Sequence, residues 1–294
     1  MKRDFLSISD FNKEEILIFL NKAKELKSFS KNNIKHKILD GKTLAMIFQK
    51  PSNRTRVSFE TGMFQLGGLA LNIQPQEIEM GVRESISAVA KTLSRYVDII
   101  MLRLFKHDDL LEFAKYATVP IINGLTDLEH PCQALADLLT IIEKKPNLQN
   151  LKIAYIGDGN NVCCSLMQIA HLFDIKMQVA TPKGYEPTCE FPNVEITNDP
   201  KIAINNADVI YTDVWVSMGQ EDEKRKRLKD FQGFQINSKL LANAKKNYIF
   251  MHCLPAHQDE EVTNDVLESP NYVIYDQAEN RLHAQKAVLN LLLK

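Results

Sequence analysis

Short apolar runs alternate with amphipathic segments along almost the whole chain. In the first half, the runs predict strands at 43–48, 69–73, 97–103 and 119–123. In the second half, they predict strands at 151–156, 176–180, 194–197, 208–214, 248–252 and 272–275. Helical patterns fill the gaps. This alternation is typical of parallel sheets covered by helices, so it predicts an α/β protein with two doubly wound parallel-sheet domains.

A polar segment that contains a proline, residues 144–150, separates the two sets of strands. Such a segment indicates a connection, so we expect a first domain at 1–145 and a second at 146–280. The last segment, 281–294, carries apolar residues at helical spacing and predicts a helix that closes the first domain. Ligands of open α/β sheets collect at the carboxyl ends of the strands, so we expect the active site in the cleft between the domains.

The composition is that of an ordinary globular protein, with 45% hydrophobic and 25% charged residues among 294. Lys+Arg number 36 and Asp+Glu 37, so the net charge of -1 offers no global field for nucleic acid or anionic lipid. The longest basic run, 224–227, follows the acidic run 221–223 with opposite charges four apart. This pattern predicts a solvated, self-paired helix face. Any anion site must therefore be local.

Nothing in the sequence points to export or to a membrane. The first ten residues turn acidic too early for a secretion signal, and no apolar run approaches the length of a membrane span. The five cysteines are an odd number and do not suggest a disulfide framework. We therefore expect a cytoplasmic protein.

Residues 51–56, Pro-Ser-Asn-Arg-Thr-Arg, directly follow the predicted strand 43–48. A strand that breaks here and enters a helix places free backbone N–H groups and the positive end of the helix dipole at the turn. Ser52 and Thr55 add hydroxyl donors, and Arg54 and Arg56 add planar guanidinium groups. The pattern favours a phosphate site, although an N-capped helix with two surface arginines would look the same in isolation.

Polar residues follow other predicted strands of the first half. Arg103 ends the run 97–103, and His130 precedes Pro131, which suits the first position of a helix. Gln133 lies in the first turn of that helix, predicted at Pro131 to Ile142. Each of these side chains alone is as compatible with a structural role as with binding, but their common position after strands favours convergence on one ligand.

A dinucleotide site is the competing interpretation of the glycine turn after strand 151–156. Val162 stands where the third glycine of that motif belongs, and strand 176–180 ends in Thr181-Pro182 without a ribose-binding acid. These two absences argue against a nicotinamide site. The turn would still present Asn160 or Asn161 to a ligand.

Two later strand ends carry unusual polarity. The apolar run 208–212 leads into Asp213 and then Ser217-Met218-Gly219, while the run 248–251 leads into His252 and Cys253. A Cys253/His257 pair without a second ligand pair is weak evidence for zinc. A thiol at a strand end can instead take part in nucleophilic or proton-transfer chemistry, and a buried, inert thiol is the structural alternative.

Taken together, four motifs resemble those of the ornithine carbamoyltransferases over essentially the whole chain. They are Ser52-Asn53-Arg54-Thr55-Arg56, His130-Pro131-Cys132-Gln133, Asp213 with Ser217-Met218-Gly219, and His252-Cys253-Leu254-Pro255. The first two are shared with the aspartate carbamoyltransferases. The acceptor motifs are of the ornithine type, and neither the His-Pro-Leu-Pro sequence nor the arginine-rich acceptor loop of the aspartate enzymes is present.

The resemblance implies transfer of a carbamoyl group from carbamoyl phosphate to L-ornithine, giving citrulline in arginine biosynthesis, by a homotrimer without cofactor or metal. It implies these carbamoyl phosphate-binding residues: Ser52, Asn53, Arg54, Thr55, Arg56, Arg103, His130, Pro131, Cys132, Gln133, Cys253, Leu254 and Arg281. It implies these ornithine-binding residues: Asn161, Asp213, Ser217 and Met218. It implies Cys253, Asp213, Arg54 and His130 as catalytic residues, with Arg281 reaching the carbamoyl group from the start of the last helix.

The acceptor amine must lose a proton before it attacks, since a side-chain amine titrates near pH ~10. Asp213 and Cys253 are the candidate proton acceptors, and cationic surroundings would favour a Cys253 thiolate. We expect Cys253 to assist the amine and not to form an acyl enzyme. The 217–219 segment is expected to close over the acceptor.

Two departures from the family pattern and two other functions remain to be weighed. Asn53 stands where threonine is usual, and Glu79 stands where a phosphate-contacting glutamine is common, so Glu79 must turn away, pair with Arg83 or be replaced by Gln76. The alternatives are a carbamoyltransferase for another amine, such as putrescine or a modified ornithine, and a non-catalytic sensor on the same fold.

Overall fold

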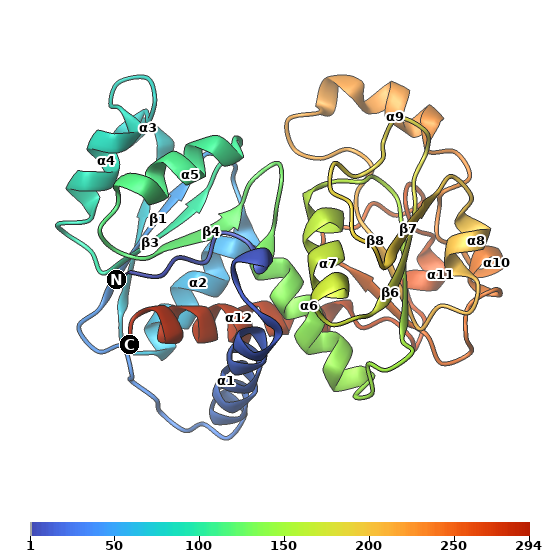
Figure 1. The fold of residues 1–294 in the computed structure, drawn as a ribbon, viewed down its shortest axis with the longest axis horizontal. Coiled ribbons are helices and arrows are strands. Elements are labelled where there is room, and N and C mark those ends of the chain that lie inside the picture. Colours follow the sequence, from blue (N-terminus) through green and yellow to red (C-terminus); the bar gives the residue numbers. More distant parts are fainter. Residues whose placement is uncertain (1) are drawn as a thin grey trace. The chain divides into compact units, whose positions relative to one another are not determined.

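The computed structural model describes residues 2–294, which divide into two compact units. The first comprises the chain up to Ala136 together with Glu279–Lys294, and the second comprises Asp137–Ala278. Each contains one parallel sheet with helices packed against it (Figure 1). The predicted α/β class with two parallel-sheet domains is confirmed.

The first unit is built on a four-stranded sheet in the order β2-β1-β3-β4, with every neighbouring pair parallel. Its strands are β1 (Thr43–Phe48), β2 (Leu69–Ile73), β3 (Ile99–Arg103) and β4 (Ile121–Leu125). Its helices are η1 (Ile8–Asp10), α1 (Lys13–Lys31), α2 (Asn53–Gln65), α3 (Pro75–Ile78), α4 (Ile86–Leu93) and α5 (His107–Tyr116). The strand order reverses between β1 and β3, which creates a ligand-binding position at their carboxyl ends.

Residues that alternate along the first sheet explain how it packs. Ala45 and Ile47 of β1 and Ile100 of β3 point to one face, where they pack with buried side chains of α4 and α5. In Figure 1, α4 and α5 lie on that side of the sheet, and α2 lies on the other. Because both faces are covered, the strand ends are held firmly.

The second unit contains a five-stranded parallel sheet in the order β7-β6-β5-β8-β9. Its strands are β5 (Lys152–Ile156), β6 (Lys176–Ala180), β7 (Val194–Thr197), β8 (Val209–Thr212) and β9 (Ile249–His252). Its helices are α7 (Asn161–Leu172), α8 (Pro200–Ile204), η2 (Glu221–Glu223), α9 (Lys224–Asp230), α10 (Ser238–Leu241) and α11 (Asn264–Leu267). The order reverses between β5 and β8. Helices α6 (Pro131–Lys144) and α12 (Ile274–Leu292) each begin in one unit and end in the other.

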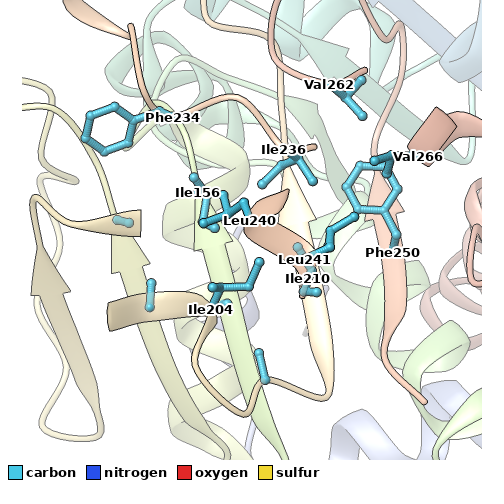
Figure 2. Packing of buried hydrophobic residues seen from close by; sticks show 14 of the residues in the cluster. Ile156, Ile204, Ile210, Phe234, Ile236, Leu240, Leu241, Phe250, Val262 and Val266 are labelled. Carbon is cyan, nitrogen blue, oxygen red and sulfur yellow. The ribbon is translucent and has the colours of Figure 1, made fainter. Parts of the chain in front are cut away.

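A buried apolar cluster supports one face of the second sheet (Figure 2). Ile156, Ile210 and Phe250 come from three strands and pack with Ile204 of α8 and Leu241 of α10. Each such side chain stabilises the fold by roughly 1.5–3 kcal/mol through removal from water. The cluster therefore fixes β5, β8 and β9, whose carboxyl ends carry the polar residues of interest.

Nine of the ten predicted strands are present, several starting one or two residues later than expected. The prediction for 272–275 is wrong, because α12 begins at Ile274 and Tyr272 forms only an isolated bridge with Phe250. A short apolar run can begin a helix as well as form a strand. As a consequence, Arg281 lies inside α12 and not at the start of the last helix.

No helix within residues 2–294 is both long enough and apolar enough to cross a membrane.

Candidate active site

The predicted anion cradle lies at the carboxyl end of β1, where the order of the first sheet reverses. Ser52 is the N-cap of α2, and its Oγ accepts a hydrogen bond from the Thr55 backbone N–H at 3.2 Å. Arg54 projects from the first turn and is exposed. Arg56, also exposed, donates to Glu60 one turn further along the helix at 3.2 Å. Arg56 thus pairs with a carboxylate of its own helix, whereas Arg54 acts on the same region as Arg103 and Arg281, since all three lower the pKa of His130.

Buried Thr55 is the centre of a polar cluster in the first unit. Its Oγ1 accepts hydrogen bonds from Arg281 Nη2 at 3.1 Å and from Arg103 Nη1 at 3.4 Å. Arg281 Nη1 also donates to Gln133 Oε1 at 2.6 Å. All these side chains are at least nine-tenths buried. Two guanidinium groups thus meet on the Thr55 hydroxyl, and Gln133 orients one of them, so the site holds two cations close together.

His130 lies in the field of these cations. Its pKa is held well below the usual 6.5, mainly by burial and then by Arg281, Arg103 and Arg54. The imidazole is therefore neutral at physiological pH, and a neutral ring can donate one hydrogen bond to a carbonyl oxygen. The shift also indicates that the three arginines act on the same small region.

The residues beside His130 have structural contacts. Pro131 is the first residue of α6. Cys132 Sγ donates to the backbone oxygen of Asn123 at 3.4 Å, and burial raises the pKa of this thiol to about 12. Cys132 is therefore held as an inert thiol. Asn53, the first residue of α2, is exposed.

The second group of predicted residues lies where the order of the second sheet reverses, after β5 and β8. Asn160 caps α7, accepting from the backbone N–H groups of Val162 at 3.0 Å and Cys163 at 3.1 Å. Its Nδ2 donates to Asp213 Oδ2 at 2.7 Å. The sequence did not distinguish whether Asn160 or Asn161 would face a ligand. In the structure Asn160 orients Asp213, and Asn161 is the first residue of α7 beside it.

Asp213 also contacts the predicted catalytic thiol. Cys253 Sγ, just after β9, donates to Asp213 Oδ1 at 2.9 Å. Asp213 is buried, and Cys253 is partly exposed. The thiol thus has a carboxylate as its hydrogen-bond acceptor, and a carboxylate beside a thiol does not favour a thiolate.

His252 organises the backbone next to this thiol. Its Nδ1 accepts from the Leu254 N–H at 2.9 Å, and its Nε2 lies 3.1 Å from Oε1 of the fully buried Glu261. Leu254 has φ 63, a left-handed conformation that this hydrogen bond holds in place. Ligand atoms of Asp213, His252 and Cys253 lie within 4.8 Å of one another, but both His252 nitrogens are engaged, so the group is poorly suited to a metal.

The predicted acceptor loop follows Asp213 on the surface of the second unit. The Ser217 N–H donates to Gln220 Oε1 at 3.1 Å, and the Gly219 N–H donates to Glu221 Oε2 at 3.0 Å. Met218 between them is 43% exposed. The tip of the loop is thus held by its own side chains and open to solvent, as a segment that closes over a ligand requires.

Glu79 is exposed and ends α3 with φ 47. Arg83 donates to Glu84 at 3.4 Å and to the backbone oxygen of Glu77. The proposed Glu79–Arg83 pair is therefore not formed. Gln76 is exposed as well.

Sequence reasoning missed two residues near this loop, Asp158 and Arg227, which form a buried ion pair at 3.0 Å. Asp158 was missed because it lies between the two glycines of the turn after β5, and Arg227 was missed because it lies in the charged run 221–227. A signal for Arg227 was present in its spacing, because the buried Phe231 and Phe234 follow it at intervals of four and seven residues, although α9 itself ends at Asp230.

Comparison with known proteins identifies the class to which this fold and these groups of residues belong. Residues 3–143 match the carbamoyl-P binding domain of the aspartate/ornithine carbamoyltransferases, and residues 149–292 match the Asp/Orn binding domain of the same family. The chain belongs to the aspartate/ornithine carbamoyltransferase family, and the resemblance drawn from the four motifs is confirmed.

Within this family, the individual relatives reported below are ornithine carbamoyltransferases. The ornithine carbamoyltransferase of Thermococcus kodakarensis is 53% identical, covering 99% of this chain and 96% of that protein. A relative in Pyrococcus furiosus with the same identity and coverage bears the name "Ornithine carbamoyltransferase, anabolic". The solved Pyrococcus furiosus ornithine carbamoyltransferase superposes with a TM-score of 0.94 at 53% identity, covering 98% of this chain and 96% of that one. The Thermus thermophilus enzyme superposes with a TM-score of 0.90 at 43% identity over 100% of both chains.

Proposed function

We propose that the protein transfers the carbamoyl group of carbamoyl phosphate to the side-chain amine of L-ornithine, giving L-citrulline and phosphate in arginine biosynthesis. The observation that carries this proposal is the pairing of Asp213 with both Asn160 and Cys253 at the reversal of the second sheet. The protein thus has two groups of polar residues. The cationic cluster of the first unit favours a negatively charged ligand, and the Asp213 group of the second unit favours a positively charged one. The first suits a phosphate, and the second suits an amine.

In this proposal residues 1–145, closed by the last helix, bind carbamoyl phosphate. Arg54, Arg103 and Arg281 neutralise the phosphate as it leaves, and the helix start capped by Ser52 adds backbone N–H donors. Neutral His130 donates to the carbonyl oxygen, which becomes negative as the amine attacks. Thr55 and Gln133 orient the buried arginines.

Residues 146–280 bind the acceptor in this proposal. Asn161, Ser217 and Met218 hold the amino-acid end of ornithine, and Asp213 attracts the cationic amine. The amine first loses one proton to Asp213. Its nitrogen then forms a bond to the carbonyl carbon, the carbon–oxygen bond to phosphate breaks, and the second proton of the nitrogen leaves with the phosphate. Cys253 and Leu254 border the reacting centre, and Cys253 orients the carboxylate by donating to it.

The experiment is a measurement of carbamoylated product with ornithine, putrescine and L-aspartate as competing acceptors. Ornithine is expected to be used at least ~100-fold more efficiently than the others, because putrescine lacks the α-carboxylate and L-aspartate lacks the side-chain amine, so that each leaves polar groups of the site unpaired. Preferred use of putrescine would replace the proposed acceptor. No turnover with any amine would favour a non-catalytic sensor.

We further propose that the protein assembles as a trimer. Exposed apolar side chains cluster on α2 and the edge strand β2: Val57 is 45% exposed, Phe64 80%, Leu69 56% and Leu71 42%. An apolar patch along an unpaired strand edge favours association with another copy, and closed rings are the usual result. Phe64→Glu is expected to reduce the mass measured by light scattering from three chains to one, while an unchanged mass would place the contact elsewhere.

A cytoplasmic location accompanies this proposal. All five cysteines are free thiols in the structure, a state that a reducing compartment maintains.

A further inference from the structure

The predicted solvated face at 224–227 is only partly correct. Arg225 is exposed and Arg227 pairs with Glu223 one turn earlier at 2.9 Å, as the charge spacing predicted. Arg227 itself, however, is only 6% exposed. A buried arginine requires partners for its donors, because an unpaired buried charge is strongly unfavourable. Its partners show what it does.

Arg227 joins two segments that lie far apart in the sequence. Its Nη1 donates both to Asp158 Oδ2 and to the backbone oxygen of Trp215, each at 3.0 Å. Asp158 belongs to the glycine turn that leads into α7, and Trp215 lies in the loop that follows β8. One nitrogen thus ties the turn to the loop, and both contacts are shielded from water.

The two segments are those that carry the acceptor residues. Trp215 is two residues after Asp213 and two before Ser217, and Asp158 is two residues before Asn160. The Trp215 ring is buried and stacks on Phe231 of the segment after α9, with ring centres 5.5 Å apart. The base of the loop is therefore fixed by Arg227 and by this stacking, while its tip at 217–219 stays open to solvent.

Burial and the ion pair with Arg227 have opposite effects on the pKa of Asp158. Burial raises the pKa of Asp158 to about 6, while Arg227 acts in the opposite direction and favours the carboxylate. The Tyr185 ring lies 5.0 Å from the Arg227 guanidinium carbon and covers it. A lysine at this position would keep the charge, but its single nitrogen could not donate both from the place of Nη1, toward Asp158 and Trp215, and from the place of Nε, toward Glu223.

We propose that Arg227 is a positioning residue for the acceptor: it fixes the base of the 213–220 loop to the Asp158 turn, so that only the tip moves when the amino acid binds. The residue touches neither substrate nor reacting atoms and acts through Asp213, Ser217 and Met218. This inference rests on the proposed function and adds to it the element that sets acceptor affinity.

The test compares Arg227→Lys with Arg225→Lys, a matched change on the exposed face of the same helix. Arg227→Lys is expected to raise the KM for ornithine about 10- to 100-fold, with the KM for carbamoyl phosphate within about twofold of the wild-type value. Arg225→Lys is expected to change neither constant. A general loss of folding would affect both substrates, so the selective change in one KM separates positioning from simple structural damage.

A second measurement does not depend on turnover. Hydrogen exchange of amides 214–220 is expected to be at least ~10-fold faster in Arg227→Lys than in the wild type, with β5 and β8 unchanged. Glu223→Gln changes the exposed end of the network, and this variant is expected to fold normally. Its KM for ornithine and its hydrogen-exchange rate at amides 214–220 are both expected to rise by about two- to threefold.

The outcomes distinguish this inference from the proposed function. If the wild type forms citrulline while Arg227→Lys and Glu223→Gln leave the ornithine KM and the hydrogen exchange of amides 214–220 unchanged, the positioning role is wrong and the activity stands. If the wild type forms no citrulline, the proposed function fails, and the exchange of amides 214–220 still decides whether Arg227 fixes the loop.

Discussion

The two groups of polar residues occupy equivalent positions in the two sheets but are built differently. In the first unit, Arg103, Arg281 and Gln133 are buried and meet around Thr55, so the cationic cluster is already assembled. In the second unit, buried Asp213 is oriented by neutral partners, and the neighbouring loop ends in an exposed tip at Met218. The first group is fixed, and the second keeps a movable part.

The difference matches the chemistry of the two ligands. A phosphate that leaves with extra negative charge is stabilised best by cations that need no rearrangement during the reaction. An amino acid must enter, lose a proton and be shielded from water, which requires a carboxylate and a segment that can close. The comparison therefore predicts that changes in the first unit affect binding and turnover of carbamoyl phosphate, and that changes in the second affect the acceptor.

The largest effect is expected from Arg54→Gln, which removes a cation from the first turn of α2. Loss of a preorganised charge at the leaving group is expected to lower kcat by about 10²- to 10³-fold. The matched comparison is Arg56→Gln, expected to cost at most a few-fold because Arg56 pairs with Glu60. Steady-state rates with both substrates saturating decide this. Equal losses in the two variants would contradict the assignment of Arg54 as the nearer cation.

Cys253→Ala is expected to lower kcat/KM for ornithine by about 10- to 100-fold, because Asp213 loses the thiol that donates to it. Cys253→Ser keeps a donor and is expected to retain more activity. Cys189→Ser, at a partly exposed thiol with its Sγ 3.7 Å from Met167 Sδ, serves as the control. Mass spectrometry during turnover provides the second measurement, since a carbamoyl thioester trapped on Cys253 would show that the thiol is a nucleophile.

Thr55→Val tests whether the first unit is truly preassembled. The change removes the oxygen on which Arg103 and Arg281 meet, and leaving buried donors without it is expected to cost about 1–3 kcal/mol of stability. The KM for carbamoyl phosphate is expected to rise about tenfold, and that for ornithine to stay within about twofold. Thr55→Ser keeps the hydroxyl and is the control. An equal rise in both KM values would remove the distinction between the two groups.

The sequence identified the strand ends because buried parallel strands form recognisable apolar runs, and the polar residue after each run must lie at one edge of the sheet. It did not reveal what those residues contact. Thr55 and Arg281 are 226 positions apart, and no local pattern indicates their hydrogen bond. Arg227 was misjudged because opposite charges four apart are visible in a sequence, whereas the buried carboxylate across the fold is not.

The same limit explains the wrong strand at 272–275. Val273 and Ile274 are buried, as a strand would require, but the residues that follow continue at helical spacing into α12. A four-residue apolar run does not distinguish these possibilities. Because of this error, Arg281 was expected at the start of a helix. In the structure it lies inside α12, where it reaches both Thr55 and Gln133.

His130 gives a prediction in which the expected change is none. Its lowered folded pKa means that its ring signals in NMR spectra should stay constant across the region near pH ~6.5 in which free histidine titrates in the same buffer. Because the folded pKa lies below the unfolded value, the stability that depends on a neutral His130 is complete above about pH 6.5 and declines as the pH falls. Titration of this ring near neutrality would show that the arginine field is weaker than the structure indicates.

Among the substitutions, the smallest effect is expected from Glu79→Gln, which tests whether α3 takes part in the fixed group of the first unit. Glu79 is exposed and Arg83 pairs with Glu84 instead, so neutralising Glu79 breaks no ion pair. Removing one negative charge near a phosphate site is expected to leave the KM for carbamoyl phosphate unchanged or to lower it by up to about twofold, less so at high salt. Glu84→Gln, which does break the pair with Arg83, is the matched control. A large loss of carbamoyl phosphate affinity on Glu79→Gln alone would give that carboxylate an essential role and would extend the preassembled group beyond β1, β3, α6 and α12.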